Sequence, residues 1–324
     1  MAMTTPSIDT VRALAKRHSN WGRWGDDDQK GTLNLITPDH IVGAARLVRQ
    51  GKAISMALPF DDAGPQTGGL RRFNPIHLML RDGADVVAGT AVRDFYGGVD
   101  RHFRGTDDLV IMPLQCGTQW DALGHVVFED HIYNGFPATE VTSLGALKND
   151  VTQGAGSMVG RGVLLDVART MGVEWLEPGH AIGGDDLDAA AAAAGVSVGI
   201  GDIVFVRTGA MTQVRRRGAW GDYAGGEAAG LGLDSVDWIA ERSVSAVATD
   251  TWGLEVRPNE TPDTNQPLHI VLIVHMGLWL GEIFDLDPIA ADCAADGVYE
   301  FMFCGPPLPF TRAVGSPLNP MAIK

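Results

Sequence analysis

The organisation of this chain is decided by one stretch of sequence, Leu114-Gln-Cys-Gly-Thr-Gln-Trp-Asp-Ala-Leu-Gly-His125. The residues that lead into it, Asp108–Leu114, form a short apolar run, which is typical of a buried strand. The stretch itself places two amides, a carboxylate and an imidazole directly after that run. Because burying polar groups without partners is costly, we expect a binding or catalytic site here.

Alternation along an extended chain indicates which of these side chains meet. Gln115, Gln119 and Asp121 stand at odd positions, so on a strand they share one face and point into one cavity. Cys116 and Trp120 then point to the opposite face. A nucleophilic role for Cys116 is therefore disfavoured.

A second segment combines an apolar helix with a strand. Pro267–Phe284 is predicted to begin as a buried helix that ends at Gly277 and to continue as a strand. In one unbroken helix, His269 and Glu282 would lie about 140° apart and could not share a site. The break at Gly277 lets both side chains point to the same place. The pattern leaves open whether His269 or His275 faces that site.

Composition bounds the class of protein. The chain has 324 residues, 45% of them hydrophobic and 20% charged, which is ordinary for a globular protein. Its 25 Lys and Arg against 40 Asp and Glu give a net charge of −15, which argues against nucleic acid or a membrane as partner. Three cysteines are too few for a disulfide framework. With no signal-peptide pattern at the start, we expect a cytoplasmic protein that acts on a small molecule.

Strand and helix signals alternate along the chain, which predicts a mixed α/β fold. Strands are expected near 161–168, 203–207 and 244–249, and helices at 38–50 and 187–194. No change of composition marks a linker. We therefore expect a single domain over residues 1–324, with residues 1–50 as a helical extension. No glycine-rich phosphate loop follows a strand, so we expect no nucleotide cofactor.

Further residues are candidates to line a substrate pocket. Tyr133 and Phe136 could wall a pocket for a flat molecule, although aromatic packing beneath the Asn-Gly turn explains them equally well. His77 could face the same pocket or lie on the surface. We include Trp120 of the central stretch in this set.

Two other features have both a functional and a structural interpretation. The Gly- and Pro-rich loop Asp61–Arg72 is either a lid or binding loop or a surface excursion. Asp250 ends a strand, where α/β sites gather, but a capping role explains it as well.

The central stretch resembles the signature of the cyclase family of metal-dependent hydrolases, which includes bacterial kynurenine formamidase and isatin hydrolase. The family pattern is His-x-Gly-Thr-His-x-Asp-x-Pro-x-His. Gln115 and Gln119 stand where the family has its two histidines, and Leu123 stands where it has Pro. The matching positions are Gly117, Thr118, Asp121 and His125. The helix–Gly–strand segment resembles the family's second signature, with His269 and Glu282.

The resemblance implies a compact, swivelling β/β/α domain, here decorated with long loops, that forms a homodimer or homotetramer. It also implies a divalent metal held by Asp121, His269 and Glu282, with His125 as the general acid and base. Gln115 and Gln119 would then be weak oxygen ligands. Losing two imidazoles shifts the preference away from zinc and towards manganese, magnesium or calcium. We expect manganese or zinc ahead of magnesium.

By this resemblance, the protein is a hydrolase that opens an amide, lactam or lactone bond in a small, cyclic or aromatic molecule. Two alternatives stay open. A metal-free acid/base enzyme, of a lyase or cyclase type, could use the two glutamines as hydrogen-bond donors to a developing oxyanion, with Asp121 and His125 moving protons. A ligand-binding pseudoenzyme would keep the pocket without the reaction.

Overall fold

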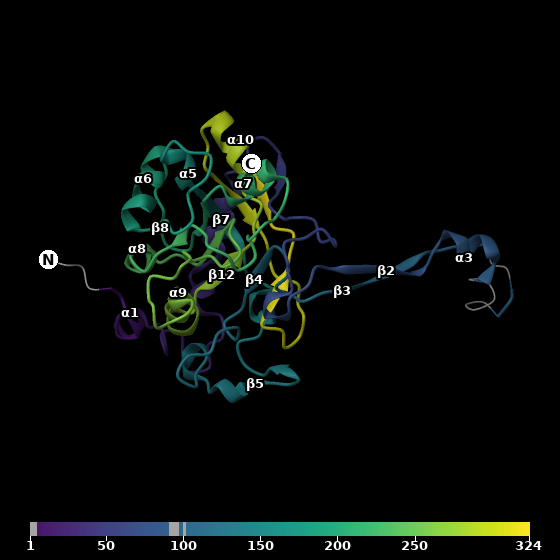
Figure 1. The fold of residues 1–324 in the computed structure, drawn as a ribbon, viewed down its shortest axis with the longest axis horizontal. Helices are drawn as coiled ribbons and strands as arrows, with labels where there is room; N and C mark the ends of the chain where they lie inside the picture. Colours follow the sequence, from purple (N-terminus) through teal and green to yellow (C-terminus); the bar gives the residue numbers. More distant parts are fainter. Residues whose placement is uncertain (1–4, 91–96, 100–101) are drawn as a thin grey trace.

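A large curled sheet runs through the centre of the molecule (Figure 1). The computed structural model describes residues 5–90, 97–99 and 102–324. Within this part of the chain, the strand order of the sheet from one edge to the other is β1 (Ala53–Ser55), β15 (Met321–Ile323), β13 (Glu300–Cys304), β7 (Val159–Asp166), β9 (Ile203–Arg207), β11 (Ala246–Thr249), β12 (Trp279–Glu282), β4 (Gln119–Asp121) and β14 (Gly315–Pro317).

The middle of the sheet is parallel and its edges are antiparallel. β7, β9, β11 and β12 pair in parallel, and every residue of β9 and β11 is buried. Strands covered on both faces are apolar throughout, as these are. β4 pairs antiparallel with both β12 and β14. This places the three residues of β4 between two strands that come from distant parts of the sequence.

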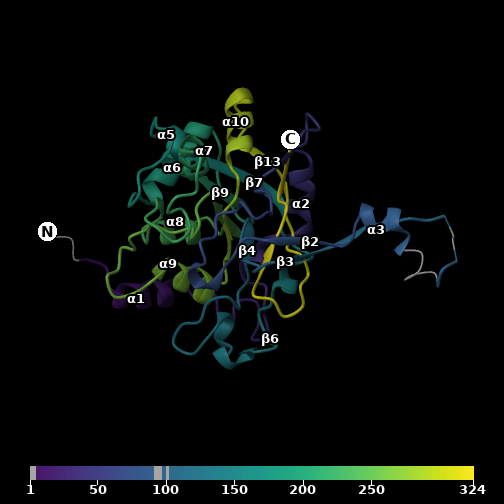
Figure 2. The same cartoon turned by 45° about the vertical axis from the view of Figure 1, so that its right-hand side comes forward.

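Helices cover the sheet and join its parallel strands (Figures 1 and 2). The shorter β10 (Gly230–Leu231) pairs with β8 (Ala181–Ile182), and β5 (Val141–Thr142) with β6 (Gly145–Ala146). In the part of the chain that the structure describes, the α-helices are α1 (Ile8–His18), α2 (Pro38–Ala45), α3 (Gly83–Ala88), α5 (Val167–Thr170), α6 (Gly184–Ala194), α7 (Ala210–Arg217), α8 (Ser235–Glu241), α9 (Pro267–His269) with its π-helical continuation Ile270–Met276, and α10 (Asp287–Asp296).

The predicted mixed α/β fold is confirmed, and several local signals act as expected. Thr37 accepts a hydrogen bond from the backbone of His40 and caps α2, which begins at Pro38. The alanine-rich helix α6 ends at Gly195, which has a φ of 66°. Of the predicted N-terminal helical extension, residues 1–4 lie outside the described residues. Within the described residues, no helix combines the length and apolar character needed to cross a membrane.

A two-stranded arm projects from the body, formed by β2 (Ile76–Arg81) and β3 (Asp107–Ile111) with α3 towards its far end (Figures 1 and 2). The prediction of a buried strand over Asp108–Leu114 is wrong. Its first residues belong to β3, where Val110 and Ile111 are about half exposed. An apolar run indicates that burying the strand would be favourable. It does not indicate that other residues of the same chain bury it.

Candidate functional site

Two neighbouring strands bring an amide and two carboxylates together in the interior. Gln119 and Asp121 lie on one face of β4, as alternation predicts, and β12 places Glu282 opposite Gln119. The Gln119 amide nitrogen donates to Glu282 Oε2 at 2.8 Å and to Asp121 Oδ1 at 3.2 Å. All three side chains are buried. One neutral amide therefore bridges two buried carboxylates.

His269 joins this group from the end of α9. Its Nε2 lies 3.1 Å from Glu282 Oε1 and its Nδ1 lies 2.6 Å from Glu255 Oε1. Gly277, with a φ of 68°, ends the helix, so the chain can turn back into β12. The structure thereby answers which histidine faces the site. His275 instead stacks on Trp21, with ring centroids 5.2 Å apart.

The electrostatics of this group favour a cation. Asp121, His269 and Glu282 each offer a ligand atom, and these atoms lie within 4.8 Å of one another. With Glu255, three carboxylates are buried here; two of them contact His269, and the third, Asp121, lies 3.8 Å from His125. Uncompensated buried negative charge is strongly destabilising, and a divalent cation would offset it. The Gln119 Oε1 atom is buried without a hydrogen-bond partner, so an amide oxygen is also available. The residues therefore fit a divalent ion, and their oxygen-rich set suits manganese better than zinc.

The pKa values of Glu282 and His269 reflect the burial of these two side chains. Burial and the charge of Asp121 raise the pKa of Glu282 to about 7. Burial lowers the pKa of His269, but its hydrogen bonds to Glu255 and Glu282 outweigh this and raise it to about 10. A charged imidazole thus holds this group together when no metal is bound.

His125 lies beside the same carboxylate. Its Nε2 is 3.8 Å from Asp121 Oδ1, and its side chain is 22% exposed, so a substrate can reach it. Burial lowers the pKa of His125, with Asp121 opposing the shift. A neutral imidazole beside a carboxylate is able to accept a proton, which is what a general base requires.

Gln115 lies near this group, although not on the strand. β4 begins only at Gln119, so the alternation does not extend back to Gln115. A Cβ atom on Gly315 would nevertheless lie 2.5 Å from the Gln115 amide nitrogen. Gly315 pairs with Asp121, so the Gln115 amide occupies the same face of the sheet. A side chain at residue 315 would therefore require the Gln115 amide to move.

Trp120 does not line a pocket, which corrects that prediction. Its ring is fully buried on the other face of the sheet, against Phe284 and Phe303. Its Nε1 donates to the Gly305 carbonyl at 2.8 Å. Cys116 is likewise buried, which raises the pKa of its thiol to about 11 and disfavours a thiolate nucleophile.

The other three pocket candidates also lie elsewhere. Tyr133 is fully buried, and its hydroxyl donates to Asp28 at 3.0 Å. Phe136 lies beneath the Lys148 ammonium, 4.8 Å from the ring centroid. These two rings pack around the turn, as the structural alternative predicted. His77 lies exposed on the arm, 2.8 Å from Asp108.

Sequence reasoning missed three residues near the site. Glu255 orients His269, and Gln66 donates to the Cys116 carbonyl at 2.9 Å. Arg72 lies over the Trp252 ring, with its guanidinium carbon 5.2 Å from the centroid. Gln66 and Arg72 belong to the loop flagged as a possible lid, but nothing in an aperiodic loop indicates which side chains point inward.

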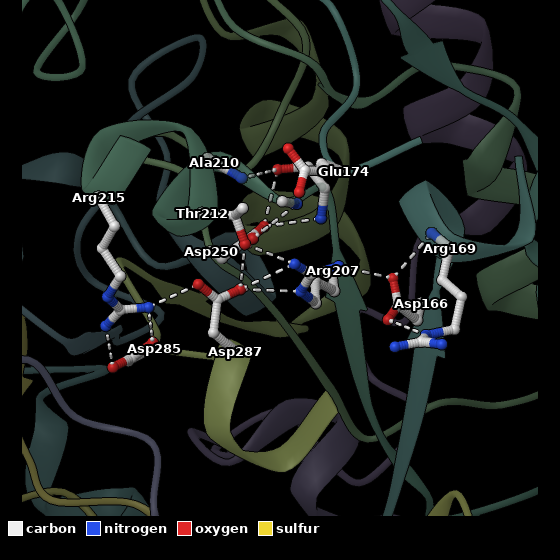
Figure 3. Close-up of polar contacts among 12 residues, drawn as sticks. Asp166, Arg169, Glu174, Arg207, Ala210, Thr212, Arg215, Asp250, Asp285 and Asp287 are labelled. Atoms are coloured by element: carbon white, nitrogen blue, oxygen red, sulfur yellow. Dashed lines mark hydrogen bonds and ion pairs between the residues drawn. The ribbon is translucent and has the colours of Figure 1, made fainter. Parts of the chain in front are cut away.

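Asp250 caps backbone groups at the end of a strand, which is the structural interpretation of this residue. It follows β11 and accepts hydrogen bonds from the backbone of Thr208 at 2.8 Å and of Gly209 at 2.9 Å. Figure 3 shows it beside a chain of ion pairs in which Arg207 contacts Asp166 and Asp287. Because these charged side chains pair with one another, we interpret the cluster as structural: it holds the ends of the central strands together.

Comparisons with known proteins identify the family of the chain. The family model described as "Cyclase: Putative cyclase" matches residues 33–256. None of the curated protein sequences matches the chain. A crystal structure described as a novel cyclase is 39% identical, with a TM-score of 0.84, covering 96% of this chain and 99% of its own. The chain therefore belongs to the cyclase family.

More distant structures share the fold. Isatin hydrolase A from Ralstonia solanacearum is 18% identical, with a TM-score of 0.60, over 88% of this chain and 95% of its own. Isatin hydrolase A from Labrenzia aggregata, bound to benzyl benzoate, is 16% identical, with a TM-score of 0.58, over 88% and 99%.

Proposed function

We propose that this protein is a metal-dependent hydrolase that opens an amide, lactam or lactone bond in a small cyclic or aromatic molecule. One observation carries the proposal: ligand atoms of Asp121, His269 and Glu282 lie within 4.8 Å of one another in the interior, with His125 beside them. Similar structures described as isatin hydrolases, one of them bound to a product analogue, support this reaction class.

The residues divide the chemistry between them. Asp121, Glu282 and His269 would hold a divalent ion, manganese or zinc, with Glu255 orienting the imidazole. Such an ion supplies a Lewis acid that polarises a carbonyl and acidifies water. His125 accepts a proton as the water oxygen bonds to the carbonyl carbon. It returns that proton to the nitrogen or oxygen that leaves, so the products are a carboxylic acid and an amine or alcohol.

A second candidate rests on Gln119. Its amide nitrogen donates to Glu282 at 2.8 Å and to Asp121 at 3.2 Å. The amide thus takes the place of a cation between the two carboxylates. This arrangement favours a metal-free acid/base enzyme, or a binding protein, in which the amide fixes the carboxylates and His125 faces the ligand.

The test is a screen of N-formyl amides, lactams and lactones against protein reconstituted with manganese or zinc. We expect turnover that is lost with chelator, restored by one of these ions, and abolished in His125→Ala. The control is His131→Ala, because His131 is exposed and bonds to the Glu129 backbone. Turnover that survives complete removal of metal would favour the second candidate. Ligand binding unchanged in His125→Ala, with no reaction in the wild type, would exclude an enzyme.

A further inference from the structure

A small cavity lies at the carboxyl ends of two central strands, β9 and β11. Its wall includes Thr208, which directly follows β9, and Thr251 and Trp252, which come shortly after β11. In α/β folds, ligands commonly bind outside the carboxyl ends of parallel strands. None of the candidate metal ligands lines this cavity, so it is distinct from the candidate metal site.

Three aromatic rings contribute to the wall of the cavity, those of Trp220, Tyr223 and Trp252. The centroids of the Trp220 and Tyr223 rings are 5.2 Å apart, and the two ring planes are inclined at 51° to each other. These two rings therefore form two sides of a corner. All three rings pack in one small apolar cluster with Leu58 and Ile283. Rings arranged at an angle to one another are the means by which aromatic cages surround a cation.

The polar atoms of these three rings are bonded to other parts of the protein. Trp220 Nε1 donates to the Ala63 carbonyl at 2.6 Å, Tyr223 Oη donates to the Asp250 carbonyl at 3.0 Å, and Trp252 Nε1 donates to Gln66 Oε1 at 3.3 Å. The rings therefore offer a ligand their carbon surfaces and no free N–H or O–H group. The face of such a ring carries partial negative charge because of its quadrupole.

Most polar side chains of the wall also have partners within the protein. Thr208 Oγ1 donates to Asp250 Oδ1 at 2.8 Å, Thr251 Oγ1 bonds to Thr249 Oγ1 at 2.8 Å, the Gln213 amide oxygen accepts from Trp175 Nε1 at 3.0 Å, and Arg217 lies 3.7 Å from Asp222. Glu227 is the exception. Among the described residues, its carboxylate has no hydrogen-bond or ion-pair partner. One arginine against the two carboxylates of Asp222 and Glu227 gives the wall a net negative charge.

We propose that this cavity binds the quaternary ammonium group of a small molecule. The aromatic faces attract a cation, and Glu227 adds a negative charge that no described residue compensates. A quaternary ammonium carries no N–H donor, so it needs none of the acceptors that the wall has already used. A primary ammonium would bring three donors to this wall, and leaving donors unpaired is costly.

The size and the exposure of the cavity agree with this ligand. Its volume is about 60 Å³, which is roughly that of two water molecules in the liquid. A methyl group is close to a water molecule in size, so the cavity takes up methyl groups of the cation while the rest of the molecule extends into solvent. Asp222 and Glu227 are exposed, so the charged part of the wall lies where the cavity opens. The site is independent of the proposed hydrolase reaction.

The test uses choline and its neutral isostere 3,3-dimethylbutan-1-ol, with binding to the full chain measured by isothermal titration calorimetry. Choline should bind at least roughly 10-fold more tightly, because the two molecules share a shape and differ in charge. A cation on one aromatic ring corresponds to roughly 2- to 30-fold in affinity. We therefore expect Trp220→Leu to weaken choline binding by about that factor, and Trp220→Phe, which keeps a ring, to weaken it less. Trp24→Leu is the matched control, since this half-buried tryptophan lies outside the cavity.

A second variant tests the charge at the opening. Because Glu227 is exposed, Glu227→Gln should weaken choline binding by only up to roughly 5-fold and leave binding of the neutral alcohol unchanged. Glu241→Gln is the control, because Glu241 on α8 is also exposed but does not line the cavity. The effect of Glu227→Gln should shrink at high salt, since an exposed charge is screened.

The outcomes separate this site from the candidate metal site. Equal affinity for choline and the alcohol, or no choline binding up to about 10 mM, overturns the proposal. Choline binding that is lost in Glu282→Gln but unchanged in Trp220→Leu would place the cation among the candidate metal ligands, which also overturns it and leaves the hydrolase proposal standing. Thermal melting confirms that each variant is folded. If Trp220→Leu does not fold, then Trp220→Phe, Glu227→Gln and the comparison with the alcohol decide the question.

Discussion

Glu282→Gln is the substitution whose effect follows most directly from the geometry. It removes one of two carboxylates from the proposed ligand set and changes little in volume. A divalent ion among ligand atoms that lie within 4.8 Å of one another is attracted to each carboxylate by at least about 4 kcal/mol at an effective dielectric constant near 20. Desolvation offsets part of this. We therefore expect metal affinity to fall by at least roughly 100-fold, or about 2.8 kcal/mol.

The loss of metal affinity is measurable as a smaller metal-induced increase in Tm. An ion at about 100 times its dissociation constant stabilises the folded state by about 2.7 kcal/mol, and at a concentration equal to that constant by about 0.4 kcal/mol. For a chain of this size, the difference of about 2.3 kcal/mol corresponds to roughly 3–4 °C in Tm. Differential scanning fluorimetry with and without manganese would show the shift in the wild type and little of it in Glu282→Gln.

Asp250→Asn is the matched control, since it also removes the charge of a fully buried carboxylate but lies in the capping position after β11. The cation-induced shift should persist in this control, whatever its basal Tm. An equal shift in Glu282→Gln would place the cation elsewhere, and no shift in the wild type with manganese or zinc would refute the reasoning.

Three further predictions use other parts of the molecule. Gln119→His supplies an imidazole between the carboxylates and should tighten zinc binding at least about 10-fold in competition with a chromophoric chelator; unchanged affinity would mean that residue 119 is not a ligand. Trp120→Ala should lower the free energy of unfolding in urea by about 3–5 kcal/mol, because Trp120 fills the core. Burial raises the pKa of Asp250 to about 6, above its usual value near 4, so the folded state holds this proton more tightly and stability falls as pH rises between about 4 and 6. The free energy of unfolding of the wild type minus that of Asp250→Asn should therefore drop by up to roughly 3 kcal/mol over that range, and a flat difference would contradict the assignment.

The sequence predicted the parts of the site that depend on regular structure. Alternation placed Gln119 and Asp121 on one face and turned Trp120 away, because the period of a strand is fixed by its backbone. The glycine at 277 indicated where a helix gives way to a strand, and that break is what lets His269 reach Glu282.

The remainder could not be predicted because it depends on tertiary contacts. Gln66 and Arg72 come from an aperiodic loop, and only the fold shows that they reach Cys116 and Trp252. Aromatic side chains near a motif, such as Tyr133, pack in a core as readily as they line a pocket, so the sequence does not distinguish the two. The strand around Ile111 was predicted to be buried because an apolar pattern indicates the need for cover without identifying what supplies it.

The central claim is that Asp121, His269 and Glu282 hold a divalent metal. Elemental mass spectrometry on protein purified without a His-tag or chelator tests it most directly. We predict near-stoichiometric manganese or zinc in the wild type and loss of that metal in Glu282→Gln. No metal, even after exposure to each divalent ion in turn, would contradict the metallohydrolase account and leave His125, Asp121 and the two glutamines as a metal-free site.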